Sequence, residues 1–191
     1  MELEKEITVK VNCNFKELHD DLMLKGFNII EEYQLNDIYM LSNSVDIISL
    51  EALDIIKNCI LIRDVVDIEK KLVYKYKKYD DVGNILKQGK LQCQITSIDD
   101  ALYFMKAIDY DELFRIEDKI TVYSNTQISL AVQYVNNKYL FIEVDDNYEE
   151  NRKYSTIDEM KTAFASLELD CDQSNYFVKK AEIIFKENKK P

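Results

Sequence analysis

The sequence has few of the residues that interrupt or divide a chain. Among its 191 residues there are three Gly and one Pro, and that Pro is the last residue. No Gly-, Ser- or Pro-rich linker separates one part of the chain from another. Length alone allows one large domain or two small ones, and the lack of a linker predicts a single domain over residues 1–191.

Histidine is scarce, and the cysteines are scattered. A single His disfavours a His-based zinc site and a Ser-His-Asp triad. The four cysteines are far apart in the sequence and form no metal-type pair; they are Cys13, Cys59, Cys93 and Cys171. We therefore expect reduced thiols in a cytoplasmic protein.

Long apolar runs and a positive charge balance are also absent. No run approaches the roughly 18 apolar residues of a membrane helix, and no basic, apolar signal segment opens the chain, so no membrane partner is expected. The net charge of -11 makes most of the surface repel nucleic acid, so none is expected as a partner. A small polyphosphate remains compatible, because an enclosed site can carry a local field opposite to the net charge. No pattern indicates an oligomeric state.

The chain does contain segments that alternate between polar and apolar residues. In the first, Glu4 and Glu6 point to one side and Ile7 and Val9 to the other, which predicts a strand with two unlike faces. One interpretation is an edge strand whose polar face lies in water. The other is that Glu4 and Glu6 point into an enclosed polar site and hold a metal ion.

Seven further strands and four helices are predicted along the chain. The strands are expected over residues 28–41, 59–65, 71–77, 90–96, 113–123, 127–135 and 138–145. The helices are expected to begin near the capping residues Asn14, Ser97, Ser155 and Ser174. Residues 43–57 fit either a short helix or a loop followed by a strand.

Each predicted strand has one polar and one apolar face. The polar faces carry Arg63, Lys71, Lys75, Lys77, Lys90, Gln92, Gln94, Arg115, Lys119, Thr121, Gln133, Glu143 and Asp145. Two arrangements fit this pattern. The polar faces lie in water in a sandwich or open sheet, or they line the inside of a closed barrel whose apolar outside is covered by amphipathic helices.

Several short motifs follow one another in an order that is informative as a whole. They are Glu4-Lys5-Glu6, Gly26-Phe27, Gln34-Leu35-Asn36-Asp37-Ile38-Tyr39, Ile60-Leu61-Ile62-Arg63, Leu72-Val73-Tyr74-Lys75 and Phe141-Ile142-Glu143-Val144-Asp145. In order and spacing they resemble the CYTH superfamily, the triphosphate tunnel metalloenzymes, which includes class IV adenylate cyclases and thiamine triphosphatases. The resemblance spans most of the chain.

This resemblance implies an α+β fold: an eight-stranded antiparallel closed β-barrel, or tunnel, with a polar interior and a cover of amphipathic helices. It implies that Mg2+ or Mn2+ is held by Glu4, Glu6, Glu143 and Asp145. It also implies that Arg63, Lys75 and Lys119 are catalytic and that these three, with Lys90, contact the substrate. These roles fit together chemically. The basic groups would neutralise a triphosphate, and a hard cation would bridge its oxygens to the carboxylates.

The chain departs from the family pattern where charged residues are expected. The departures are Thr8, Leu61, Gln92, Gln94, Thr121 and Gln133. Two functions therefore stay open. One is metal-dependent phosphohydrolysis or adenylate-cyclase-like chemistry on a nucleotide, thiamine or inorganic triphosphate. The other is a catalytically impaired tunnel domain that binds a nucleotide or phosphorylated ligand without turnover. A third, an α+β interaction protein without a tunnel, follows if the resemblance misleads.

Overall fold

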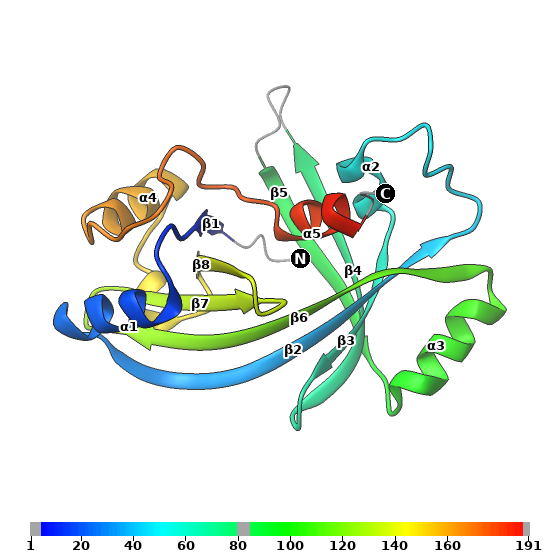
Figure 1. The fold of residues 1–191 in the computed structure, drawn as a ribbon, viewed down its shortest axis with the longest axis horizontal. Helices are drawn as coiled ribbons and strands as arrows, with labels where there is room; N and C mark the ends of the chain where they lie inside the picture. Colours follow the sequence, from blue (N-terminus) through cyan, green and yellow to red (C-terminus); the bar gives the residue numbers. More distant parts are fainter. Residues whose placement is uncertain (1–4, 80–84, 189–191) are drawn as a thin grey trace. The chain divides into compact units, whose positions relative to one another are not determined.

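The computed structural model describes residues 5–79 and 85–188, with side chains described outside residues 76–88. Figure 1 shows the elements in chain order. They are β1 (Glu6–Lys10), α1 (Phe15–Leu24), β2 (Asn28–Ser42), α2 (Ala52–Lys57), β3 (Ile60–Val65), β4 (Glu69–Tyr79), β5 (Ile85–Gln94), α3 (Ile98–Ala107), β6 (Tyr110–Ser124), β7 (Ser129–Val135), β8 (Tyr139–Asp145), the 3-10 helix η1 (Glu149–Asn151), α4 (Ile157–Ala165) and α5 (Lys180–Asn188).

The strands form one eight-stranded sheet in the order β1-β8-β7-β6-β2-β3-β4-β5. The pairings of β1 with β8, β8 with β7, β7 with β6, and β2 through β5 in turn are antiparallel. The predicted α+β class with eight antiparallel strands is therefore confirmed. The sheet order ends at β1 and β5, so closure into a barrel is not confirmed over the described part of the chain.

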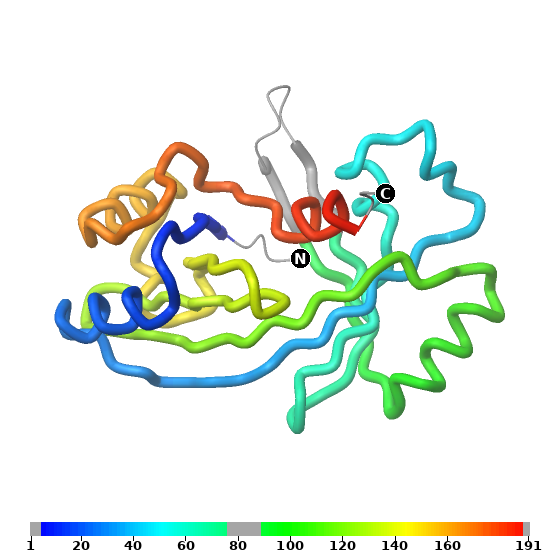
Figure 2. Tube along the Cα trace, viewed as in Figure 1, coloured from blue at the N-terminus to red at the C-terminus, as the bar shows by residue number. Residues whose placement is uncertain are grey.

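The chain forms two compact units. Among the described residues, one, the β3–β5 unit, comprises residues 34–79, 85–117 and 179–188. The other, the β7–β8 unit, comprises residues 5–33 and 118–178. The long strands β2 and β6 contribute residues to both units, and Figure 2 shows their unbroken course along the chain.

The core of the β7–β8 unit lies between the sheet and the helices α1 and α4. Ile7 and Val144 from the strands pack in one cluster with Leu18 of α1 and Phe164 of α4. Both helices begin with a capping box, in which the side chain of the N-cap residue and that of a Glu three residues later each accept from the other residue's backbone N–H. These local signals place the helices where the sequence predicted them.

A segment without helix or strand runs along the second edge of β1. The backbone N–H of Thr8 donates to the carbonyl of Tyr176 at 2.9 Å, and that of Val178 donates to the carbonyl of Thr8 at 3.0 Å. The predicted helix start at Ser174 is wrong, and α5 begins at Lys180. The Ser174 hydroxyl donates to the Asp172 carboxylate at 2.6 Å, and backbone bonds to β1 take the place of helical ones. The segment also protects β1 from pairing with other chains.

The β3–β5 unit has helices on both faces of its strands. Ile38 and Ile62 pack with Met105 of α3 in one cluster. Tyr39, which points to the other face of β2, stacks on Phe114 with ring centroids 4.3 Å apart, and Phe114 contacts Phe185 of α5 at 5.7 Å. Within residues 43–57 the structure has the short helix α2, the first of the two predicted alternatives.

Candidate functional site

Three carboxylates share one face of the β7–β8 unit. Glu6 lies directly opposite Asp145, and Thr8 lies directly opposite Glu143, in the ladder between β1 and β8. Residues directly opposite one another in an antiparallel pair point to the same face. The neighbours Ile7 and Val144 are buried in the core on the other face. The polar face predicted for the first strand therefore includes these acids, while Glu4 lies outside the described residues.

The carboxylates have amide partners in their own unit. Gln133 Nε2 donates to Glu143 Oε2 at 3.2 Å. Asp145 accepts two hydrogen bonds from Asn147, one from the backbone N–H at 3.0 Å and one from Nδ2 at 2.7 Å. These bonds satisfy carboxylate oxygens through neutral groups, so a metal ion would have to compete with them.

Two tyrosines that the sequence analysis did not single out lie beside the carboxylates. The hydroxyls of Tyr33 and Tyr148 are hydrogen-bonded to each other. Burial raises the pKa of Tyr33 to about 12 against the lowering effect of its bond to Tyr148, and the negative charge of Glu143 adds a smaller upward effect. Both phenols therefore remain protonated at neutral pH. The chain has 13 Tyr, and nothing in the pattern marked these two.

The donor types suit a hard cation, because Mg2+ and Mn2+ prefer carboxylate oxygen. The geometry does not assemble such a site: over the residues that the structure describes, no group of three or more His, Cys, Asp or Glu side chains could hold a metal ion. Glu4, the fourth predicted ligand, is not among those residues. A metal site at Glu6, Glu143 and Asp145 therefore stays a prediction.

The β3–β5 unit carries a basic face. Its ladders place Arg63 opposite Lys71 and Lys75 opposite Lys90. Val73 lies between Lys71 and Lys75 on the same face of β4. We call the residues Arg63, Lys71, Lys75 and Lys90 the basic face. The pattern predicted that these four side chains point the same way, and the register brings them together.

Two acids belong to this face: Glu69, which forms an ion pair with Lys71, and Asp37. The Arg63 guanidinium donates to Asp37 through two bonds, Nε to Oδ1 at 2.6 Å and Nη2 to Oδ2 at 2.5 Å. Burial alone would raise the pKa of Asp37, but the charges of Arg63, Lys75 and Lys180 outweigh it and hold the pKa below its usual range. Asp37 is thus ionised and neutralises part of the positive charge of the basic face. It stands in the motif around Gln34, where sequence reasoning gave it no role.

Lys119 does not join the predicted carboxylates. The ladder between β6 and β7 pairs Ile120 with Gln133 and Lys119 with Tyr134, so Lys119 lies on the opposite face from Gln133. Its Nζ donates to Asn137 Oδ1 at 2.9 Å at the exposed hairpin turn. The last five residues of β6 are all buried, so both faces of that strand end are covered. Alternation could not show which of its faces is functional, and the predicted grouping of Lys119 and Thr121 with Gln133 is not found.

Comparison with known proteins gives different results for the sequence and for the fold. No family model and no curated protein matches the sequence. Solved structures match over nearly the whole chain. Protein PH1819 from Pyrococcus horikoshii is 15% identical, with a TM-score of 0.66, covering 96% of this chain and 99% of that one.

Two further matches are named for an activity. A putative adenylate cyclase from Vibrio parahaemolyticus is 10% identical, with a TM-score of 0.62, covering 96% of this chain and 98% of that one. The putative adenylyl cyclase HpAC1 from Hippeastrum, described as having a dominant triphosphatase activity, is 12% identical, with a TM-score of 0.62, covering 100% of this chain and 98% of that one. At these identities the likeness shows the fold alone: the chain shares the fold of these solved structures, two of which are named as adenylate cyclases, the kind of protein that its motifs resemble.

Proposed function

We propose that this protein binds a triphosphate and acts on it with the help of a divalent cation. The observation that supports this most is the register of β3, β4 and β5, which gathers Arg63, Lys75 and Lys90 on one face of a chain whose net charge is -11. A polyanion is the ligand that such a local cationic face favours. The names of the Vibrio and Hippeastrum proteins, a putative cyclase and a cyclase with triphosphatase activity, support a triphosphate in particular.

In this proposal the basic face binds phosphate oxygens and neutralises the charge that develops on the leaving group, the main protein contribution in phosphoryl transfer. The carboxylates Glu4, Glu6, Glu143 and Asp145 would hold Mg2+ or Mn2+. The cation, when bound, supplies charge neutralisation at the phosphate. The proposal covers two reactions, hydrolysis and cyclisation. It also includes a closed tunnel, a single domain and a cytoplasmic location. Over the described residues, no helix is long and apolar enough to span a membrane.

A second candidate is binding without turnover. Gln133, which replaces an expected acid, donates to Glu143, and Asp37 already holds Arg63 through two bonds. Gln133 supplies no charge where an acid is expected, and Asp37 offsets the charge of Arg63, while Lys75 and Lys90 remain on the basic face. This candidate predicts ligand binding with no product.

A phosphate-release panel separates the two candidates. ATP, thiamine triphosphate and tripolyphosphate are each incubated with the full chain in Mg2+, in Mn2+ and in a chelator. Turnover predicts release that needs the cation and that falls at least about tenfold in Glu6→Gln, because that variant removes a charge from the carboxylate set. Glu149→Gln, at an exposed position of the 3-10 helix η1, is the matched control and keeps full activity.

Each result decides something. If no substrate is turned over but a triphosphate raises the melting temperature, the second candidate is correct. If there is neither release nor a shift in melting temperature, both candidates are wrong and the fold serves another purpose.

A further inference from the structure

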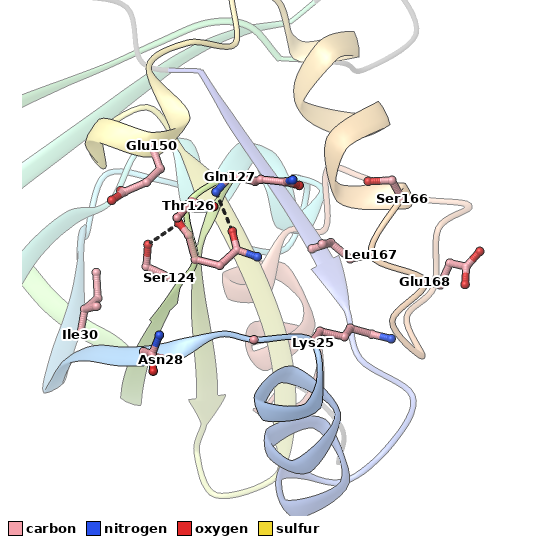
Figure 3. A pocket seen from close by; sticks show the side chains of 12 residues that line it. Lys25, Asn28, Ile30, Ser124, Thr126, Gln127, Glu150, Ser166, Leu167 and Glu168 are labelled. Carbon is pink, nitrogen blue, oxygen red and sulfur yellow. Dashed lines mark hydrogen bonds between the residues drawn. The ribbon is translucent and has the colours of Figure 1, made fainter.

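A polar pocket of about 790 Å3 lies in the β7–β8 unit (Figure 3). Its walls come from the turn after α1, the start of β2, the β6–β7 hairpin, η1 and the turn after α4. None of its lining residues belongs to the carboxylates Glu6, Glu143 and Asp145 or to the basic face. The pocket is therefore a separate candidate site.

Two carboxylates stand on different walls of this pocket. Glu150 lies on one side and Glu168 on the other, with Leu167 and Ile30 also in the lining (Figure 3). Ile30, on β2, is 53% exposed, which is a large exposure for an apolar strand residue. The pocket thus offers negative charge at two places and apolar surface as well.

A buried hydroxyl, that of Ser129, holds the Glu150 carboxylate in position. Ser129, which is wholly buried, has its Oγ 2.9 Å from Glu150 Oε2 and 2.8 Å from Ser124 Oγ. Hydrogen bonds from its own backbone N–H and from Ser129 hold the pKa of Glu150 below its usual range, so the carboxylate is charged at neutral pH. It is held at the pocket wall as an acceptor.

The end of α4 adds negative potential to the pocket, while the charge of Lys153 acts on Glu150 in the opposite sense. The C-terminus of α4, which has no basic residue in its last turn, leads into the pocket through Ser166 and Leu167. A helix C-terminus carries a partial negative charge. The one cation of the lining, Lys25, is paired with Asp21 at 3.0 Å. Hydroxyl and amide groups supply further acceptors from Ser124, Thr126 and Asn28.

We propose that this pocket binds an aliphatic polyamine, whose ammonium groups pair with Glu150 and Glu168 while its methylene chain lies against Ile30 and Leu167. A compact metal ion does not account for the separation of the two acids on different walls or for the exposed apolar surface. A sugar is less suited, because no aromatic ring lines the pocket for stacking.

Spermidine is the probe, titrated into the full chain by calorimetry at low ionic strength. We expect one site per chain, with an affinity that falls as salt is added. n-Butylamine, which has one ammonium group, is expected to bind at least about tenfold more weakly. Equal binding of n-butylamine and spermidine would overturn the proposal.

Two variants remove the proposed contacts, and a third controls for net charge. Glu150→Gln and Glu168→Gly are each expected to weaken spermidine binding about fivefold or more, since each loses a charge-assisted contact. Glu149→Gln, beside Glu150 but outside the lining, is expected to bind as the natural chain does. An unchanged affinity in either pocket variant, or an equal loss in the control, contradicts the site.

The Glu168 variant also guards against loss of folding. Glu168 has a φ of 51°, in the left-handed region that favours Gly. Glu168→Gly should therefore melt at or above the temperature of the natural chain while binding spermidine less well. This combination separates loss of the ligand contact from loss of structure.

Discussion

Asp37 and Arg63 form a bidentate pair in which both side chains are mostly removed from water, with 9% and 15% of their side-chain surfaces exposed. A buried pair of this kind adds little net stability compared with apolar residues of similar size, but removal of one partner leaves an uncompensated charge. At the residue scale, then, the pair fixes the position of the Arg63 guanidinium on the basic face. A phosphate ligand bound to that face would contact the guanidinium in this position.

The variant Arg63→Met tests this role at the level of stability. It leaves the Asp37 carboxylate buried without its main partner, so we expect the free energy of unfolding to fall by roughly 3–5 kcal/mol. Adding Asp37→Asn should restore much of the loss, since the buried charge is then gone. Urea denaturation of the four chains of this double-mutant cycle measures the effect, and a loss that the second substitution does not reduce would count against the pairing.

At the scale of elements, what was predictable depended on whether the signal was local. The predicted caps Asn14 and Ser155 identified the starts of α1 and α4 to within one residue, the N-cap of α4 being Thr156, because a capping box involves neighbouring residues only. Ser174 misled, because backbone bonds to β1, far away in sequence, decide the conformation of its segment. The sequence could not show which face of β6 is functional, since Val122 and Tyr123 are both fully buried although they point in opposite directions.

The wholly buried side chain of Asn151 connects the ends of two strands in the β7–β8 unit. No sequence pattern predicted this role. Asn151 Oδ1 accepts from the Ser129 backbone N–H at 2.9 Å, and its Nδ2 donates to the carbonyls of Ser129 and Asp145 at 2.9 and 2.8 Å. Asn151 thereby joins the start of β7 to the end of β8. Its side chain is hydrogen-bonded to backbone groups of other elements, so no local sequence pattern predicts these bonds.

We predict that Asn151→Ala lowers the free energy of unfolding by about 3 kcal/mol. Three hydrogen bonds are lost, and the backbone groups that they satisfied are left buried without those partners. The matched control is Asn147→Ala, at an exposed position in the same loop, which should change stability by less than about 1 kcal/mol. Thermal or urea denaturation measures both variants, and similar losses in the two would show that the buried contacts do not matter.

For the whole molecule, the motifs predicted the fold better than they predicted the site. The order of strands and helices is kept in proteins that are 10–15% identical to this chain, because a fold needs only the apolar alternation and the caps. The site needs particular charges at particular positions, and here several are changed. Arg63, Lys75 and Lys90 share a face, as the alternation indicated, whereas Lys119 lies elsewhere and Asp37, Tyr33 and Tyr148 were not foreseen.

Calorimetric titration of tripolyphosphate into the full chain tests most directly whether the basic face binds a triphosphate. The natural chain is compared with Lys75→Gln and with Lys16→Gln, an equal change of charge on the exposed surface of α1. We predict binding that is at least about tenfold weaker in Lys75→Gln and unchanged in Lys16→Gln. Equal affinities in all three chains, or no binding to the natural chain, would contradict the account.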